Sequence, residues 1–427
     1  MSSTQSSYLL INGNIFICGY NIFGQLGMGD TTDRSIFTKV PDISNVKQIS
    51  CGANHAFILL NDGTIMGCGY NDNGQLGLGN TSNKNIFTKV PDVSNVKQVS
   101  CGYNYTFILL NDGTIMSCGA NSSGQLGLGD ISNKNIFTKV PDISNVKQIS
   151  CGQYHTFILL NDGTLLSCGI NKDGRLGLGD AVDRNVFTKI SDISNITEIR
   201  CGSSYTFIIL NDGTIMSCGH NACGQLGLGD TTSKNIFTKV HNISNVKQVL
   251  CGHYHTFILL DDNNIMSCGD NSSGQLGLND KVNRNIFTKV PDISNINQIS
   301  CGQYNTFILL NDGTVMSCGY NSYGQLGLND KVNRNIFTKI ILTDISINGI
   351  KYLISRKSDN IELSTIDINN EFLIVPATSK DTLDFNNGIK SLSLLTDDTQ
   401  YGKPIDKILE TFSLYKKMSN VDMQLWE

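Results

Sequence analysis

A period of fifty residues, kept without insertion or deletion, is the feature that most limits how this chain can fold. The block CGANHAFILLNDGTIMGCGYNDNGQLGLGNTSNKNIFTKVPDVSNVKQVS begins at Cys51, and matching blocks begin at Cys101, Cys151, Cys201, Cys251 and Cys301. Residues 8–50 form a shortened first copy, so the repeats cover about residues 8–340 of the 427. A fixed period of this length indicates a repeat architecture, and it therefore decides the fold before any single motif does.

Each block predicts four short strands. In the second copy these are residues 46–50, 56–60, 64–69 and 87–90, which are rich in apolar and β-branched side chains. The second and third strands are joined through Asp62-Gly63, a strong hairpin signal, and the sixth copy has Asp262-Asn263 there. Because Gly and Asn both tolerate a positive φ, we expect Gly63 and Asn263 to be structural turn residues.

Four-stranded units with no helical segment between them predict an all-β protein, a seven-bladed β-propeller. The first copy supplies three strands and the next six supply four each, one short of the 28 that seven blades need. We expect a strand within 341–356 to close the ring beside the N-terminal strand, because closure removes an exposed edge. The propeller domain is then residues 1–356.

The period is lost after the propeller, and residues 357–427 are expected to form a small α+β C-terminal extension. It contains strand-like segments and, over residues 404–418, the pattern of one amphipathic helix that Pro404 opens. Docking of this helix on its own chain and docking on a partner are both open alternatives.

The recurring motifs SCGxNxxGQLGLGD, CGxxxTFILLNDGT and NIFTKV resemble the repeats of the regulator of chromosome condensation family. The resemblance spans all seven copies and implies a seven-bladed propeller, in agreement with the strand count. It also implies that a protein partner is a small GTPase, since the best-known relatives exchange guanine nucleotide on Ran-like GTPases. Some relatives recruit substrates to a ubiquitin ligase.

Two departures from the exchange factors of the family weaken the implied exchange activity on a Ran-like GTPase. Those factors are similar to one another in carrying an inserted wedge, whereas the fifty-residue period here has no insertion. The chromatin-binding version has a basic N-terminal arm, whereas this chain begins with the uncharged MSSTQSS. No exchange residue can therefore be transferred to this sequence.

Composition and sequence patterns argue against several classes of protein: nucleic-acid-binding, secreted, membrane-spanning and metal-binding. The net charge of −5 argues against nucleic-acid binding through bulk charge. The N-terminus lacks a signal peptide, and no apolar run reaches the roughly 18 residues of a membrane span. Fourteen cysteines contain no C-x-x-C pair, so we expect buried thiols and no metal or cofactor. We expect a monomer that is intracellular, either cytoplasmic or nuclear, and not secreted.

The glycine-rich stretch CGYNDNGQLGLGN at residues 68–80 raises the alternative of a phosphate-binding loop. Gly74 and Gly77 have glycine counterparts in every copy, but Gly79 becomes Asn279 and Asn329 in the last two. Asn can replace Gly in a left-handed conformation, yet it adds bulk where a phosphate needs bare backbone. These residues are therefore predicted to be structural turns.

Catalysis is not expected, because most polar residues recur six or seven times and an active site is normally one place. Variation between copies concentrates in the turn between the first and second strands (the A–B turn) and in the loop after the third strand. Both should lie on one face of the disc. The residues predicted to line this partner-binding face are Tyr20, Phe23, Tyr70, Tyr103, Tyr105, Tyr154, His155, Arg175, Tyr205, His220, His253, Tyr254, His255, Tyr304, Tyr320 and Tyr323. A face rich in Tyr and His and poor in charge has the composition of an adaptable recognition surface.

The fourth copy also gathers Lys172, Arg175, Arg184 and Arg200 into a local basic spot, which is read either as solvated surface or as an acidic contact of a partner. The sequence as a whole predicts a non-catalytic protein–protein interaction scaffold. The alternatives are a guanine-nucleotide exchange factor for a Ran-like GTPase and a substrate-recruiting partner of a ubiquitin ligase.

Overall fold

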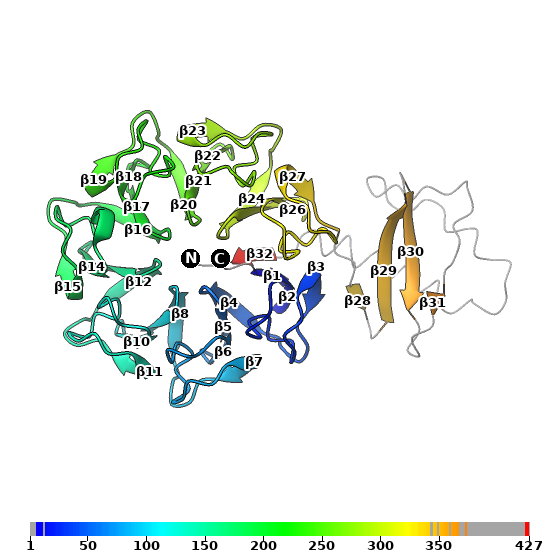
Figure 1. Cartoon of the computed structure of the whole chain (residues 1–427), viewed down its shortest axis with the longest axis horizontal. Coiled ribbons are helices and arrows are strands. Elements are labelled where there is room, and N and C mark those ends of the chain that lie inside the picture. The colour runs from blue at the N-terminus through cyan, green and yellow to red at the C-terminus, as the bar shows by residue number, and fades with distance from the viewer. Residues whose placement is uncertain are drawn as a thin grey trace.

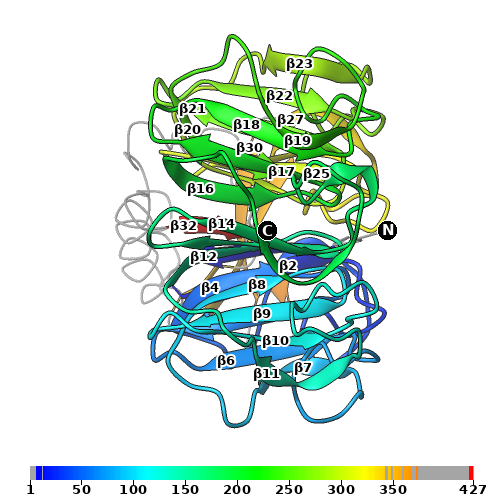
Figure 2. The ribbon, with the colours of Figure 1, turned by 90° about the vertical axis from the view of Figure 1, so that its left-hand side faces the viewer.

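Seven four-stranded antiparallel sheets are arranged around a common axis in the computed structural model (Figure 1), so the predicted seven-bladed β-propeller is confirmed. The structure describes residues 6–11, 13–341, 345–347, 350–357, 360–366, 372–373 and 423–426. Figure 2, turned by 90°, shows the strands running between the two faces of the disc, where the turns and loops lie.

In blades 2 to 7 the strands follow one another from the axis outward, in the order β4-β5-β6-β7 in blade 2. Their bounds are β4 (Val46–Cys51), β5 (His55–Leu60), β6 (Ile65–Gly69), β7 (Lys84–Lys89), β8 (Val96–Cys101), β9 (Tyr105–Leu110), β10 (Ile115–Gly119), β11 (Lys134–Lys139), β12 (Val146–Cys151), β13 (His155–Leu160), β14 (Leu165–Gly169), β15 (Arg184–Lys189), β16 (Ile196–Cys201), β17 (Tyr205–Leu210), β18 (Ile215–Gly219), β19 (Lys234–Lys239), β20 (Val246–Cys251), β21 (His255–Leu260), β22 (Ile265–Gly269), β23 (Arg284–Lys289), β24 (Ile296–Cys301), β25 (Asn305–Leu310), β26 (Val315–Gly319) and β27 (Arg334–Lys339). A 3₁₀ turn, η1 (Lys172–Gly174), lies in blade 4.

Blade 1 closes the ring by combining both ends of the chain. Its strands are β1 (Ser6–Ile11), β2 (Asn14–Gly19), β3 (Arg34–Lys39) and, innermost, β32 (Met423–Trp426). In Figure 1, β32 lies beside β1 next to the axis, and the register pairs Tyr8 with Trp426 and Ile11 with Met423. The closing strand therefore differs from the one expected within 341–356.

The segment expected to close the ring belongs to another sheet. Strands β28 (Ile345–Ile347), β29 (Ile350–Lys357), β30 (Asn360–Ile366) and β31 (Phe372–Leu373) pair with one another in that order. Their backbone groups are thus engaged there and do not pair with β1. The expected helix at 404–418 lies outside the described residues.

The hydrophobic core lies between neighbouring blades. Side chains alternate along each strand, so one face of a blade packs against the blade before it and the other against the blade after it. Phe57 of blade 2, for example, is fully buried, and its ring contacts that of Phe137 in blade 3 edge-on at a centroid distance of 6.2 Å. This burial of both faces explains why the second strand, such as AFILL in β5, is almost wholly apolar.

Polar bonds between inner strands reinforce one part of the ring. The Gln48 amide donates to the carbonyl of Val99 at 2.9 Å and accepts from its backbone N–H at 3.1 Å. Gln98 and Gln148 make the same pair of bonds to Ile149 and Ile199. This glutamine clamp joins blades 2, 3, 4 and 5, whereas the next position along the ring is Glu198, a carboxylate that has no N–H to donate to a carbonyl.

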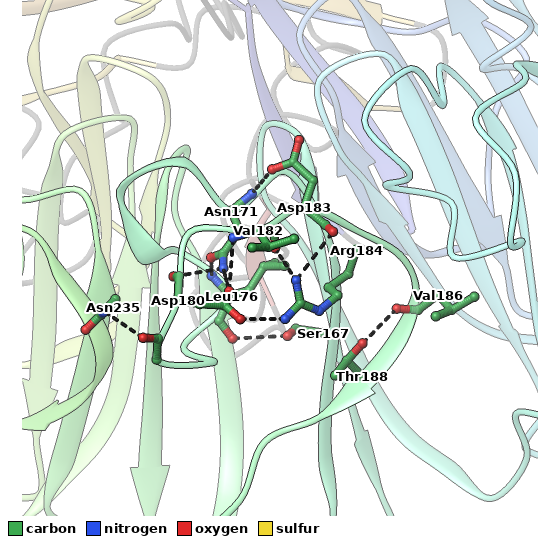
Figure 3. A network of polar contacts seen from close by, with 11 residues as sticks. Ser167, Asn171, Leu176, Asp180, Val182, Asp183, Arg184, Val186, Thr188 and Asn235 are labelled. Atoms are coloured by element: carbon green, nitrogen blue, oxygen red, sulfur yellow. Dashed lines mark hydrogen bonds and ion pairs between the residues drawn. The ribbon is translucent and has the colours of Figure 1, made fainter.

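A buried asparagine organises the long loop between the third and fourth strand of each blade, as blade 4 shows (Figure 3). The Asn171 side chain donates to Asp180 and accepts from the backbone N–H of Leu176 at 2.9 Å. Asp180 is in turn paired with Arg184 at 2.6 Å. Asn21 and its six counterparts are all fully buried, so this side chain is part of the fold.

The predicted turn residues adopt left-handed backbone. The φ angles are +81° at Gly63, +80° at Gly74, +64° at Gly77 and +77° at Gly79, and Asn263, Asn279 and Asn329 lie at +61°, +62° and +60°. A Cβ added at Gly74 or Gly77 would lie 2.4 Å from Asn135 Cα or 2.5 Å from the Phe137 ring. At Gly79 the nearest atom is 3.9 Å away, which explains why Asn replaces this glycine and not Gly74 or Gly77.

Candidate functional site

The two variable segments of each blade are joined to each other on one face of the disc. In blade 2 the backbone N–H of Tyr70, in the loop after β6, donates to the carbonyl of Asn54, in the turn after β4, at 2.8 Å. The equivalent bond occurs in blades 3 to 7, at 2.8–2.9 Å. We name this surface the A–B face, and it carries both sets of variable residues.

Backbone hydrogen bonds join neighbouring blades around part of the axis on this face. Among the described residues, the third residue of a Cys-Gly-X turn bonds through its N–H to the carbonyl of the same residue in the next blade at four places: Ala53 to Tyr103, Tyr103 to Gln153, Gln153 to Ser203 and His253 to Gln303. A cavity of about 110 Å³ lies at the axis, lined by the Cys-Gly-X turns of blades 2 to 7.

Aromatic side chains form a continuous chain of ring contacts over blades 5, 6, 7 and 1. Neighbouring ring centroids lie 3.9–6.4 Å apart in the order Tyr20, Tyr323, Tyr320, Tyr304, His253, Tyr254 and His220. We name these seven residues the aromatic arc. All are partly exposed except His253, which is buried.

Two further aromatic pairs lie on the rest of the face. Phe23 of blade 1 contacts Tyr70 of blade 2 with ring centroids 5.0 Å apart, and Tyr103 of blade 3 contacts Tyr154 of blade 4 at 5.4 Å. These four side chains are partly exposed. The arc and the two pairs together place eleven of the sixteen predicted face residues in ring contact with another of them.

Four other predicted face residues, Tyr105, His155, Tyr205 and His255, lie in the interior and are 0% exposed. They begin the second strand of their blades and point toward the next blade. The Tyr105 hydroxyl, for example, donates to the backbone carbonyl of His155 at 2.6 Å. These residues hold the blades together, and we leave them out of the candidate surface.

The buried histidines are neutral because of their hydrogen bonds and their burial. His55 Nε2 lies 3.0 Å from Thr106 Oγ1, and because that hydroxyl donates to the carbonyl of Gln75, it accepts the His55 proton. Burial lowers the pKa of His55 and of His255 to about 3, and it lowers the pKa of His155 well below its ordinary value. His253, at the axis, also has a pKa of about 3 because of burial.

The arginines of the predicted basic spot are paired with acids. Arg175 is 5% exposed, and its guanidinium bonds to the Lys172 carbonyl at 2.8 Å and to Asp173 at 3.2 Å. Arg184 pairs with Asp180, and Arg200 with Glu198. Arg175 and Arg184 of blade 4 and Arg200 of blade 5 therefore do not present their guanidinium charges as a free cationic patch.

Asp270 occupies the position after the third strand in blade 6, where other blades have Tyr, Ala, Ile or His, and it is 8% exposed. Its Oδ2 accepts from the Gln275 amide at 2.7 Å, just as His220 Nδ1 lies 2.8 Å from the Gln225 amide in blade 5. In blades 1, 2 and 3 the corresponding amide nitrogens of Gln25, Gln75 and Gln125 are buried without a partner. Position 270 thus supplies an acceptor that most blades lack.

Chemical groups for catalysis or metal binding are sparse in the part of the chain that the structure describes. No group of three His, Cys, Asp or Glu side chains there is placed to hold a metal ion. The fourteen cysteines are free thiols, and burial raises the pKa of Cys18 and of its counterparts in the other blades, which makes them poor nucleophiles. The helices of the described residues include none long and apolar enough to cross a membrane.

The geometry defines a seven-bladed β-propeller with one variable, aromatic-rich face. A family model described as the RCC1-like domain matches residues 1–247, more than half of the chain. Models of the regulator of chromosome condensation (RCC1) repeat match residues 246–275, 296–325 and 262–309. The chain therefore belongs to the regulator of chromosome condensation family, as its repeats predicted.

Solved structures show the same fold at low identity. The chain is similar to yeast RCC1 (Prp20) in its complex with Kap60, with 19% identity, a TM-score of 0.72, and coverage of 82% of this chain and 87% of that one. Prp20p from Saccharomyces cerevisiae matches with 20% identity, a TM-score of 0.71, and coverage of 82% and 90%. Human WBSCR16 matches with 20% identity, a TM-score of 0.69, and coverage of 78% and 95%.

Sequence reasoning passed over Asp270 as a site residue, although the signal was present. It is the one acidic residue among the seven that follow the third strand, and the others there are Tyr20, Tyr70, Ala120, Ile170, His220 and Tyr320. What the sequence does not show is its burial, since that depends on how the loop folds over it.

Proposed function

We propose that this protein is a non-catalytic scaffold that binds a protein partner through the aromatic arc of its A–B face. The observation that carries this proposal is the continuous ring contact from Tyr20 to His220 across four blades. Tyr side chains supply large contact area with a polar tip at a low cost in side-chain entropy, which is why Tyr is enriched where proteins bind each other.

The rigidity of the face supports the same function. Its A–B turns are tied by backbone bonds to the loops after the third strands and, in four places, to one another around the axis. A pre-organised surface loses little conformational entropy on binding, so its contacts translate into affinity more fully. The aromatic arc lies over blades 5, 6, 7 and 1. The glutamine clamp joins blades 2 to 5, so the two features share blade 5 alone.

Affinity capture from cells tests the proposal with substitutions that the chain itself provides. Tyr304→Asn and Tyr320→Ala place on blade 7 the residues found at the equivalent positions of blade 3, Asn104 and Ala120. The fold of blade 3 shows that both residues fit this position. We expect the double variant to lose the proteins that the wild-type chain captures.

A matched control changes an exposed side chain away from the face. Ile236 lies on the outer strand β19 and is 56% exposed, so Ile236→Ala removes apolar surface of a comparable kind. We expect it to capture the same proteins as the wild type. Equal capture by the wild type, the double variant and the control contradicts the proposed function.

A specific alternative is guanine-nucleotide exchange on a Ran-like GTPase. Prp20p, to which the fold is similar, is reported with its binding properties to Gsp1p and histones. An exchange assay with labelled nucleotide on a Ran-type GTPase separates the two functions: the scaffold predicts an unchanged release rate, and accelerated release favours exchange. Recovery of a ubiquitin ligase among the captured proteins favours the substrate-recruiting role.

A further inference from the structure

A buried carboxylate without a cationic partner lies within the aromatic arc. Asp270 is 8% exposed and is the one Asp or Glu that is buried among the described residues. The ion pairs between described residues include none with Asp270. Buried charges in proteins are normally paired, because removing an ion from water is costly.

The hydrogen bonds of Asp270 fix its position without neutralising it. Oδ1 accepts from the backbone N–H of Ser272 at 3.1 Å, and Oδ2 accepts from the Ser272 hydroxyl at 3.1 Å and from the Gln275 amide at 2.7 Å. All three donors are uncharged. The carboxylate is therefore held in one orientation, and none of these donors forms an ion pair with it.

The aromatic residues around Asp270 suit a cation as well. Tyr254 and Tyr304 both lie within electrostatic reach of its charge: burial, followed by smaller effects that include Asp270, raises the pKa of each phenol. The faces of Tyr rings attract ammonium and guanidinium groups at distances within about 6 Å. The backbone N–H of Asp270 also donates to the carbonyl of Tyr254 at 2.8 Å, so the carboxylate belongs to the same part of the face as this ring. A carboxylate close to tyrosine rings is a combination that binds such groups.

The nearby histidines do not supply the missing positive charge. Burial lowers the pKa of His253 to about 3, and burial also lowers the pKa of His220, so both are neutral at pH 7. Arg175, whose charge also acts on Tyr254, is engaged by Asp173 at 3.2 Å. No cationic side chain of the described residues therefore pairs with Asp270, and a bound partner can supply one.

We propose that the Asp270 carboxylate, together with the neighbouring aromatic residues Tyr254 and Tyr304, receives a Lys or Arg side chain of the bound protein partner. This inference rests on the proposed function, since it names the chemistry of the partner that the aromatic arc binds. It also explains why blade 6 departs from the Tyr, Ala, Ile or His that the other blades have at this position.

Replacing Asp270 by the residue of the adjacent blade removes its charge and keeps an acceptor for the glutamine amide. Asp270→His places in blade 6 the His220 of blade 5, where the ring already accepts the glutamine amide at 2.8 Å. We expect this variant to melt no lower than the wild type, because it removes a buried unpaired charge. Asp72→Asn is the control, since Asp72 is an exposed acid on the same face.

The probe is a random heptapeptide display library, selected on the whole chain and counter-selected on the Tyr304→Asn, Tyr320→Ala double variant. We expect the recovered peptides to share a Lys or Arg. Replacing that residue by Gln should weaken binding by roughly tenfold or more, and Asp270→His should produce an equal loss. Asp72→Asn should leave the affinity within about twofold, as surface charges do.

The opposite results are distinguishable from failure of the proposed function. Arc-dependent peptides that lack a basic residue, or that bind Asp270→His as tightly as the wild type, overturn the Asp270 inference and leave the scaffold function in place. If no peptide and no cellular protein depends on the arc, both fall. Self-association of the wild type that Asp270→His abolishes assigns the cation to a second copy of this chain and overturns its assignment to another protein.

Discussion

Acid should destabilise this protein in the pH range where histidine, and not carboxylate, titrates. His55, His155 and His255 are fully buried and neutral, and burial lowers the pKa of His55 and His255 to about 3. The pKa of His155 is lowered by burial and, after it, by the charge of Arg175. In the unfolded chain each should return to about 6.5.

The direction in which the free energy of unfolding changes with pH depends on whether the folded or the unfolded chain binds more protons. Above pH 6.5 neither state binds a proton at these sites, so their full contribution to stability is present. As the pH falls from 6.5 toward 3, the unfolded chain gains protons that the folded chain refuses, and the free energy of unfolding falls. Between pH 7 and pH 5 the loss is about 2 kcal/mol for each histidine whose folded pKa is about 3, which are His55, His253 and His255, or about 6 kcal/mol for these three. His155 adds a loss of the same sign.

Urea denaturation at a series of pH values between 7 and 4.5 measures this effect. The loss is comparable to the whole stability of a typical domain, about 5–15 kcal/mol, so the urea midpoint should fall steeply. His55→Asn is the matched variant, because Asn305 occupies this position in blade 7. It should reduce the pH slope by about one quarter, because His55 is one of four histidines, with His155, His253 and His255, whose pKa burial lowers strongly. A midpoint that stays constant from pH 7 to pH 5, or a slope unchanged in His55→Asn, refutes the reasoning.

Three further predictions concern the ring. Gly79→Asn should lower the free energy of unfolding by less than about 1 kcal/mol, since Asn279 occupies this position naturally. Gly77→Asn should lower it by about 3 kcal/mol or more, because the added Cβ would lie 2.5 Å from a phenyl ring. Equal melting temperatures of the two variants would contradict this. Gln98→Glu removes the amide that donates to the next blade, so chemical denaturation should show a loss of about 1–3 kcal/mol, and an unchanged midpoint would exclude a role for the clamp. Deletion of residues 421–427 leaves β1 as an unpaired edge and should lower the melting temperature and promote aggregation measured by light scattering; a monomer of unchanged stability would show that β32 is dispensable.

The repeats made most of the fold predictable. The fifty-residue period, the hairpin turns and the strand count predicted seven blades with one strand missing from the copies. The outer strand was placed at 87–90 by its apolar residues, but β7 begins at Lys84, because pairing with β6 continues past an irregularity between Gly67 and Gly69. Backbone pairing at an edge depends little on side-chain polarity, so the pattern of apolar residues underestimates such a strand.

The closing strand could not be identified in the same way. Met423–Trp426 is four residues long and lies in a segment with no repeat, while residues 341–356 directly follow the last copy and are equally strand-like. Local propensity does not distinguish two such candidates. The choice depends on pairing over more than 400 positions of sequence separation, as between Tyr8 and Trp426.

The placement of the variable segments was predictable, but the orientation of each side chain was not. Variation between blades predicted that two loop segments share one face, and hydrogen bonds such as Tyr320 N–H to the Tyr304 carbonyl join them there. That this face binds a partner stays a prediction. The same variation was misleading at Tyr105 and His155. There, different residues satisfy one interior position, because a Tyr hydroxyl reaches a backbone carbonyl and a His ring reaches a threonine hydroxyl in the next blade.

Hydrogen exchange on the complex with a captured partner tests the central claim most directly. If the aromatic arc is the binding surface, peptides that span residues 253–254, 303–304 and 320–323 should gain protection, and the outer strands β7, β11 and β19 should not. Asp270→His should reduce the protection around residue 270. Protection confined to the outer strands or to the opposite face of the disc would contradict the account.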